Sequence, residues 1–107
     1  MSEPRWYLLG FYVPETHLEA VLEAVFSAGA GDYGAYDRCA WTCPGEGRFR
    51  PGRHSSPFIG EAGADTRVRE IKAECIVPEA AREAVKAALI GAHPYEEPAF
   101  HFIPISR

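Results

Sequence analysis

An internal repeat is the sequence feature that most constrains the fold. The segment from Val13 to Tyr36 aligns without gaps on the segment from Val77 to Phe100, and both begin with Val-Pro-Glu and then carry Glu-Ala-Val. Proline suits the first turn of a helix, where its missing N–H costs nothing, and the glutamate that follows complements the helix dipole. Each half of the chain is therefore predicted to form a strand, a helix and a second strand.

Hydrophobic spacing supports both helices. Apolar residues recur at intervals of three and four along one face, which is the pattern of a half-buried helix. The first helix is expected to end at Gly29 and Gly31, and the second at Pro94. The predicted buried faces consist of Leu18, Val21, Leu22, Val25 and Phe26 in the first helix and, more weakly, Ala81, Val85, Ala88 and Leu89 in the second.

Extended segments flank these helices and define a fold class. We expect strands at 5–13, 33–43, 47–51, 66–77 and 99–105. Two βαβ halves joined by a hairpin-like excursion describe an α+β, ferredoxin-like βαββαβ sandwich, with an antiparallel sheet and both helices on one face. The whole chain, residues 1–107, is interpreted as one domain, because its length suits a single modest core.

The first strand is apolar on both faces, which bears on self-association. Trp6, Leu8 and Tyr12 alternate with Tyr7, Leu9, Phe11 and Val13. One set can face the helices, but the other must also be covered, and in a chain this short we expect a second copy to cover it. The strand therefore predicts a homo-oligomer.

Composition excludes several classes of partner and suggests a compartment. A net charge of −4 argues against a nucleic-acid surface, and no apolar run approaches a membrane span, so neither a nucleic acid nor a membrane is an expected partner. The N-terminus does not resemble a signal peptide, and three cysteines suggest reduced thiols in the cytoplasm. Cys39 and Cys43, if extended, lie about 13 Å apart, too far for a disulfide or a shared zinc. With Trp41 they are expected to line one sheet face.

Four motifs together resemble a known family. They are GAGDYGAYDRCAW, GEGRFRPG, SPFIGEAG and HPYEEPAF, and the resemblance runs from about Trp6 to Ile105. The chain is similar to a stand-alone form of the inserted middle domain of the Nif-three-like (NGG-interacting-factor-three-like) proteins. The resemblance implies a CutA/PII-like fold, which occurs in trimers of ferredoxin-like subunits, and so favours a trimer. Full-length relatives carry a dinuclear metal centre, and some are described as cyclohydrolases, but the resemblance places those ligands in flanking domains.

The segment from His93 to Glu97 concentrates ionisable groups near the C-terminus. Pro94 disfavours helical geometry at His93, and a proline turn brings the Cα atoms of His93 and Glu96 within about 7 Å. One interpretation is a divalent-metal or acid–base site, with His93, Glu96 and Glu97 as metal ligands. The other, which we favour, is a structural turn whose histidine bonds to Glu96 or to a free carbonyl near the helix end.

A long loop beside a cluster of arginines is the second candidate site. The stretch from Pro51 to Thr66 has little regular periodicity, and loops of this length are often functional. Arginine forks and exposed backbone N–H groups at glycines could hold a small anionic molecule. The alternative is a solvated hairpin whose arginines pair with nearby carboxylates. The predicted ligand-binding residues are Arg48, Arg50, Arg53, His54 and Gly60.

These observations favour a binding function over catalysis. The sequence shows no nucleophile–base pair, since His54 beside Ser55 and Ser56 rarely gives triad geometry. We expect a cytoplasmic, self-associating, small-ligand-binding or partner-binding module, with a regulatory role open to it and no catalysis of its own. The first alternative is a divalent-metal-binding protein or weak metal-dependent hydrolase that uses the segment from His93 to Glu97. The second is a purely structural interaction module.

Overall fold

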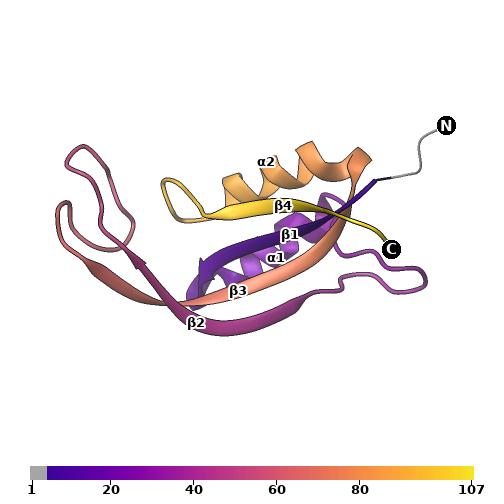
Figure 1. Cartoon of the computed structure of the whole chain (residues 1–107), viewed down its shortest axis with the longest axis horizontal. Coiled ribbons are helices and arrows are strands. Elements are labelled where there is room, and N and C mark those ends of the chain that lie inside the picture. The colour runs from indigo at the N-terminus through magenta and orange to yellow at the C-terminus, as the bar shows by residue number, and fades with distance from the viewer. Residues whose placement is uncertain (1–4) are drawn as a thin grey trace.

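The computed structural model describes residues 5–107, which form one four-stranded sheet and two helices (Figure 1). Each α-helix is preceded by one turn of 3-10 helix that follows a proline. The elements are β1 (Trp6–Pro14), η1 (Glu15–His17), α1 (Leu18–Ser27), β2 (Trp41–Phe49), β3 (Thr66–Pro78), η2 (Glu79–Ala81), α2 (Arg82–Ala92) and β4 (Phe100–Ile105).

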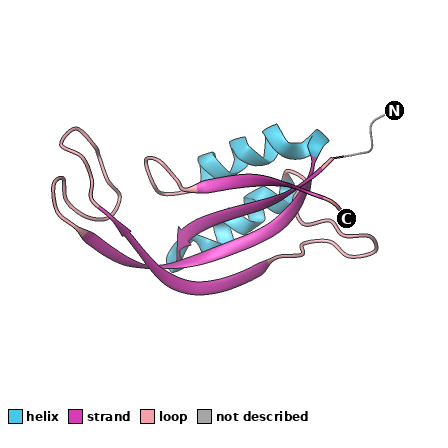
Figure 2. Cartoon of the chain, in the orientation of Figure 1, coloured by secondary structure: helices cyan, strands magenta, loops and turns pink. Residues whose placement is uncertain are grey.

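The sheet is antiparallel, with strand order β2-β3-β1-β4 and both helices on one face (Figure 2). The central strand β1 places Leu9 between Cys75 of β3 and Phe102 of β4. This arrangement confirms the predicted α+β, ferredoxin-like fold. Each predicted repeat corresponds to a strand, a helix and a second strand: β1-α1-β2 in the first half of the chain and β3-α2-β4 in the second.

The core lies between the sheet and the two helices. Alternate residues of β1 and β3 point toward the helices, and the apolar stripes of α1 and α2 meet them, as the spacing predicts. The buried cluster consists of Leu9, Phe11, Val13, Val21, Leu22, Val25, Ala30, Ile71, Ala73, Cys75, Val77, Val85 and Leu89.

The second strand corrects a prediction. The sequence predicts extended chain over 33–43 and again over 47–51, but a single strand, β2, occupies Trp41–Phe49. Residues before it form a loop, because Gly31, Gly34 and Arg38 adopt positive φ, which extended strands do not contain. Cys39 therefore precedes the strand. The prediction that Cys39, Trp41 and Cys43 line one sheet face is wrong for Cys39.

The loop before β2 is held against α1 by one side chain. Arg38 forms a two-armed ion pair with Glu23, and its guanidinium lies 5.0 Å from the centre of the Phe26 ring. The Cys39 N–H donates to the Gly31 carbonyl at 2.8 Å, which closes the loop. All three cysteines are free thiols.

The molecule is elongated by its β2–β3 hairpin. The chain measures 50 × 25 × 20 Å, with a radius of gyration of 14.9 Å, whereas a compact chain of this length has about 13 Å. Figure 1 shows the hairpin running past the ends of the helices and bending. Over residues 5–107, no helix has both the length and the apolar character needed to cross a membrane. The hairpin extension positions the candidate site.

The sheet face opposite the helices is uncovered in the single chain and carries an apolar row beside the ion pair of Lys72 and Glu74. The strand register places Leu8 between Ile76 and Ile103, and Ile103 is 47% exposed. Gly10 has no side chain, so the His101 ring lies over it, 6.3 Å from the Tyr12 ring. We call this side the outer sheet face. Its central residues are Trp6, Leu8, Tyr12, Ile76, His101, Ile103 and Ile105.

Candidate ligand pocket

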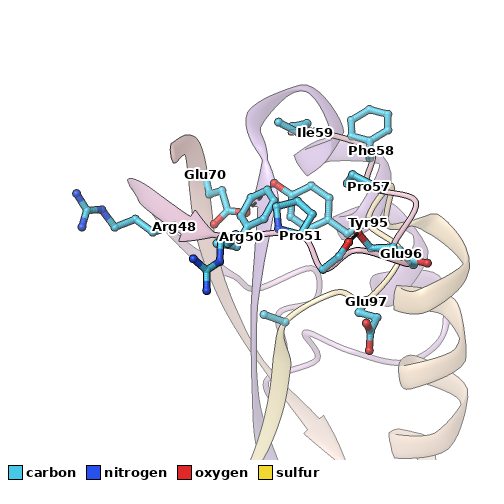
Figure 3. Close-up of a pocket in the computed structure, with 14 residues that line it drawn as sticks. Arg48, Arg50, Pro51, Pro57, Phe58, Ile59, Glu70, Tyr95, Glu96 and Glu97 are labelled. Carbon is cyan, nitrogen blue, oxygen red and sulfur yellow. Dashed lines mark hydrogen bonds between the residues drawn. The ribbon is translucent and has the colours of Figure 1, made fainter. Parts of the chain in front are cut away.

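The two segments predicted as separate candidate sites meet at one pocket. The loop at 50–65 connects β2 to β3, and the turn at 93–99 connects α2 to β4. A hollow of about 340 Å³ lies between them (Figure 3), within the size range of small-molecule sites. We call it the ligand pocket. It is lined by Arg48, Phe49, Arg50, Pro51, Gly52, Ser55, Pro57, Phe58, Ile59, Glu70, Tyr95, Glu96, Glu97 and Ala99.

His93 fixes the turn that forms one wall of the pocket. As predicted, α2 ends before Pro94, and His93 is extended, with φ −75° and ψ 137°. Its side chain is buried, with Nε2 2.7 Å from the Tyr12 carbonyl oxygen and Nδ1 3.1 Å from the Tyr95 amide nitrogen. Because the carbonyl can only accept and the amide can only donate, this geometry fits the neutral tautomer protonated on Nε2. Burial lowers the pKa of His93.

Tyr95 connects this turn to β3. Its hydroxyl donates to the Glu70 carboxylate at 2.8 Å (Figure 3). Its ring lies 6.1 Å from the ring of Phe49. Burial, aided by the bond to Glu70, raises the pKa of Tyr95 above its ordinary value. Gly47 makes the arrangement possible, because a Cβ there would collide with the Glu70 side chain. The phenol is therefore a fixed, neutral donor in the floor of the pocket.

Two contacts hold the loop against the body of the protein. The Ser56 N–H donates to Glu96 Oε1 at 3.0 Å. The Phe58 ring packs edge-on against His17 of η1, with ring centres 5.3 Å apart. Phe58 nevertheless remains 54% exposed, so it forms part of the rim. The loop thus folds back over the turn, and the space between them is the pocket.

The arginines predicted to bind a ligand divide into two groups. Arg48 and Arg50 line the pocket, whereas Arg53 is exposed and does not. Arg48 lies 3.5 Å from the carboxylate of Glu46, both side chains being largely exposed. The solvated-hairpin alternative predicts that these arginines pair with nearby carboxylates. Within residues 5–107, Arg48–Glu46 is the only such ion pair of Arg48, Arg50 and Arg53, and surface pairs of this kind are weak.

The other predicted ligand residues lie outside the pocket. His54 is an exposed loop residue that does not line it. Gly60 also lies outside; its φ of +93° and its close approach to Thr66 account for a glycine at this position. Sequence reasoning missed Phe49, Pro57 and Ile59, which give the pocket its apolar walls. Their only signal in the sequence is that they lie within the motifs GEGRFRPG and SPFIGEAG.

The predicted metal ligands do not converge. Both ring nitrogens of His93 are engaged in hydrogen bonds, and Glu96 accepts from Ser56 rather than from the histidine. Glu97 lies on the pocket wall (Figure 3). In the part of the chain that the structure describes, no three His, Cys, Asp or Glu side chains are grouped so as to hold a metal ion. The turn as folded is thus built by hydrogen bonds, and the metal interpretation stays a prediction.

Comparison with known proteins supports the resemblance drawn from the motifs. The sequence is 51% identical over 99 residues to a GTP cyclohydrolase 1 type 2 homolog of Mycobacterium leprae, covering 92% of this chain and 25% of that protein. A homolog of the same name from Halalkalibacterium halodurans is 45% identical, covering 94% of this chain and 27% of the relative. The chain thus spans about a quarter of the curated relatives it matches. No family model matches the sequence.

Solved structures agree with this relationship and with the fold. A Bacillus cereus protein related to NIF3 superposes with a TM-score of 0.84 at 34% identity, covering all of this chain and 27% of that one. CutA1 from Shewanella sp. SIB1 superposes with a TM-score of 0.71 at 17% identity, covering 99% of this chain and 86% of that one. The second likeness concerns the fold alone. The resemblance to Nif-three-like proteins and to the CutA-like fold is confirmed.

Proposed function

We propose that this chain, which matches about one quarter of the length of its Nif-three-like relatives, is a self-associating module that binds a compact organic anion in the ligand pocket. The relatives and the CutA-like fold support a small binding or regulatory module. The observation that carries the proposal is the convergence of the loop at 50–65 and the turn at 93–99 on one hollow. Neither segment alone encloses that space.

The character of the pocket suggests how such a ligand would lie. Its apolar walls suit a hydrocarbon or ring body, and Arg48 and Arg50 at one side suit a carboxylate or phosphate. Of its three glutamates, Glu70 is bonded to Tyr95 and Glu96 to the Ser56 amide, which offsets part of their charge. A ligand with an apolar body and an anionic end satisfies both sides.

A binding role fits the state of the ionisable groups better than catalysis. His93 has both ring nitrogens engaged away from the pocket, and the phenol of Tyr95 is held as a neutral donor. General acid–base work requires a group that can exchange a proton with the substrate at working pH. We therefore propose that the chain has no catalysis of its own. We assign it to the cytoplasm on account of its free thiols.

Self-association is proposed from the outer sheet face. Leu8, Ile76 and Ile103 form one row across three strands there, without a covering layer in the single chain. An exposed apolar row of this kind is typical of an interaction surface, and another copy of the chain can supply the cover. The resemblance to CutA-like and PII-like proteins favours three copies. The mass of the purified protein in solution, measured by light scattering, tests this; a monomer at micromolar concentration would contradict it.

The ligand proposal is tested by a thermal-shift screen of organic acids and sugar phosphates. Ligand at about 100 times its dissociation constant stabilises a fold by roughly 2.7 kcal/mol, which raises the melting temperature by several degrees in a domain of this size. The hits should be lost in Arg50→Gln and kept in Arg53→Gln, which removes the same charge from the same loop but outside the pocket. If no compound shifts the wild type, or if Arg50→Gln keeps every hit, the proposal is wrong.

A further inference from the structure

A second hollow adjoins the ligand pocket at the hairpin. Its volume is about 500 Å³, and it shares Arg48, Phe49 and Arg50 with the ligand pocket. Its remaining walls come from the start of β3 and the residue before it. The complete lining is Arg48, Phe49, Arg50, Asp65, Thr66 and Arg67. We call it the arginine pocket.

The arginine pocket is the positively charged one of the two. Three of its six lining residues are arginines, and Asp65 is its only carboxylate. The ligand pocket, by contrast, has three glutamates against two arginines. A compact anion with several charges, and without an apolar body to bury, is therefore better matched to the arginine pocket.

The strand register brings two of these arginines together. Arg48 of β2 and Arg67 of β3 are direct cross-strand partners. Like charges directly opposite each other on a sheet are destabilising, whereas the adjacent row pairs Glu46 with Arg69. A bound anion between Arg48 and Arg67 would convert this repulsion into two charge-assisted interactions.

Local carboxylates leave these arginines largely available. Arg69 is engaged by Glu15 at 3.1 Å, and Arg48 lies 3.5 Å from Glu46. Within residues 5–107, neither Arg50 nor Arg67 has a carboxylate oxygen within 4.0 Å. Figure 3 shows Arg48 and Arg50 extending away from Tyr95 and Glu96. Because both arginines line both hollows, they lie on the boundary between the ligand pocket and the arginine pocket.

We propose that Arg48, Arg50 and Arg67 form a site for a small oxyanion with two or more negative charges, such as pyrophosphate. The planar fork of arginine matches pairs of phosphate oxygens, which makes three arginines around one hollow suited to this class of ligand. Arg67 follows the predicted loop in the sequence and is not one of the five residues predicted to bind a ligand. The site goes beyond the proposed function, because it requires no occupant in the ligand pocket.

Pyrophosphate itself is the probe that tests the site. Its binding to the wild-type protein is measured by isothermal titration calorimetry, and its effect on melting temperature is compared with sodium chloride at equal ionic strength. Arg67→Gln should weaken binding by about tenfold or more, since it removes a charged partner. Arg53→Gln is the matched control: it removes the same charge from an exposed position in the adjacent loop, outside both pockets. It should leave binding within about twofold, because it removes a solvent-screened charge that lines neither pocket.

The outcomes separate this inference from the proposed function. If pyrophosphate stabilises the protein no more than chloride does, or if Arg67→Gln binds it as tightly as the wild type, the oxyanion site is wrong. The site would also be wrong if the wild type does not bind pyrophosphate and Arg67→Gln forms a smaller oligomer. Carboxylates of another copy of the chain would then be the partners of these arginines. Tyr95→Ala should weaken organic anions and spare pyrophosphate. Pyrophosphate binding without any organic-anion hit would contradict only the ligand pocket.

Discussion

Tyr95 and Glu70, on separate elements, are joined by a 2.8 Å hydrogen bond from the phenol to the carboxylate. The bond links the turn after α2 to the middle of the long β2–β3 hairpin. It depends on Gly47, whose missing side chain gives Glu70 its room. The wall and the floor of the ligand pocket are thereby held in one arrangement.

Tyr95→Phe should destabilise the protein by about 1–3 kcal/mol, because the Glu70 carboxylate keeps its partial burial and loses a donor. Urea denaturation measures the loss as a lower midpoint with an unchanged slope. Tyr36→Phe is the matched control, since Tyr36 is 73% exposed and makes no side-chain hydrogen bond within the described chain. Equal stability of the two variants would show that the Tyr95–Glu70 bond contributes nothing.

His93→Ala should also lower the free energy of unfolding, by about 1–3 kcal/mol, because the Tyr12 carbonyl and the Tyr95 amide both lose a partner. The structural interpretation predicts the same loss with and without EDTA. If EDTA destabilises the wild type and leaves His93→Ala unaffected, a metal site that includes His93, Glu96 or Glu97 is the better explanation. Thermal melts of both proteins in chelator decide between the two.

The stability of the protein should depend on pH through His93. Burial lowers the pKa of His93 below its ordinary value of 6.5, despite opposing effects of the bond to Tyr12 and the charge of Glu70. The unfolded chain therefore binds the proton more tightly than the folded chain does. Stability from this group is complete above pH 6.5 and is lost as pH falls from there through the lower folded-state pKa. As the pH is lowered across this window, the urea midpoint of the wild type should fall. The midpoint of His93→Ala should depend less on pH.

The sequence supported the fold more fully than the site, and particular residues show why. Repeats and helical stripes are local patterns, so Val21, Val25, Val85 and Leu89 could be assigned to the core from spacing alone. The error over 33–43 arose because Tyr33 and Tyr36 have strand propensity, while the positive φ of Gly34 and Arg38 made a loop.

The pocket could not be predicted because it depends on a long-range contact. The loop was identified from its unusual length, and the turn from its concentration of ionisable groups. Only the contact between Ser56 and Glu96, with Phe58 against His17, shows that the loop folds back onto the turn. Nothing in the local sequence encodes that contact. For the same reason, only the strand register shows that Arg67 lies directly opposite Arg48.

Ile103→Lys should reduce the mass of the protein in solution by disrupting the outer sheet face. Ile103 is 47% exposed in the single chain, so the charge is tolerated in an isolated subunit but would be buried where two copies meet. Ile90→Lys is the matched control, because Ile90 is 45% exposed on α2, in the opposite layer of the fold. Light scattering should give the wild-type mass for Ile90→Lys and a smaller mass for Ile103→Lys. If Ile103→Lys keeps the wild-type mass, the copies associate through another surface, and the apolar character of the outer sheet face needs a different explanation.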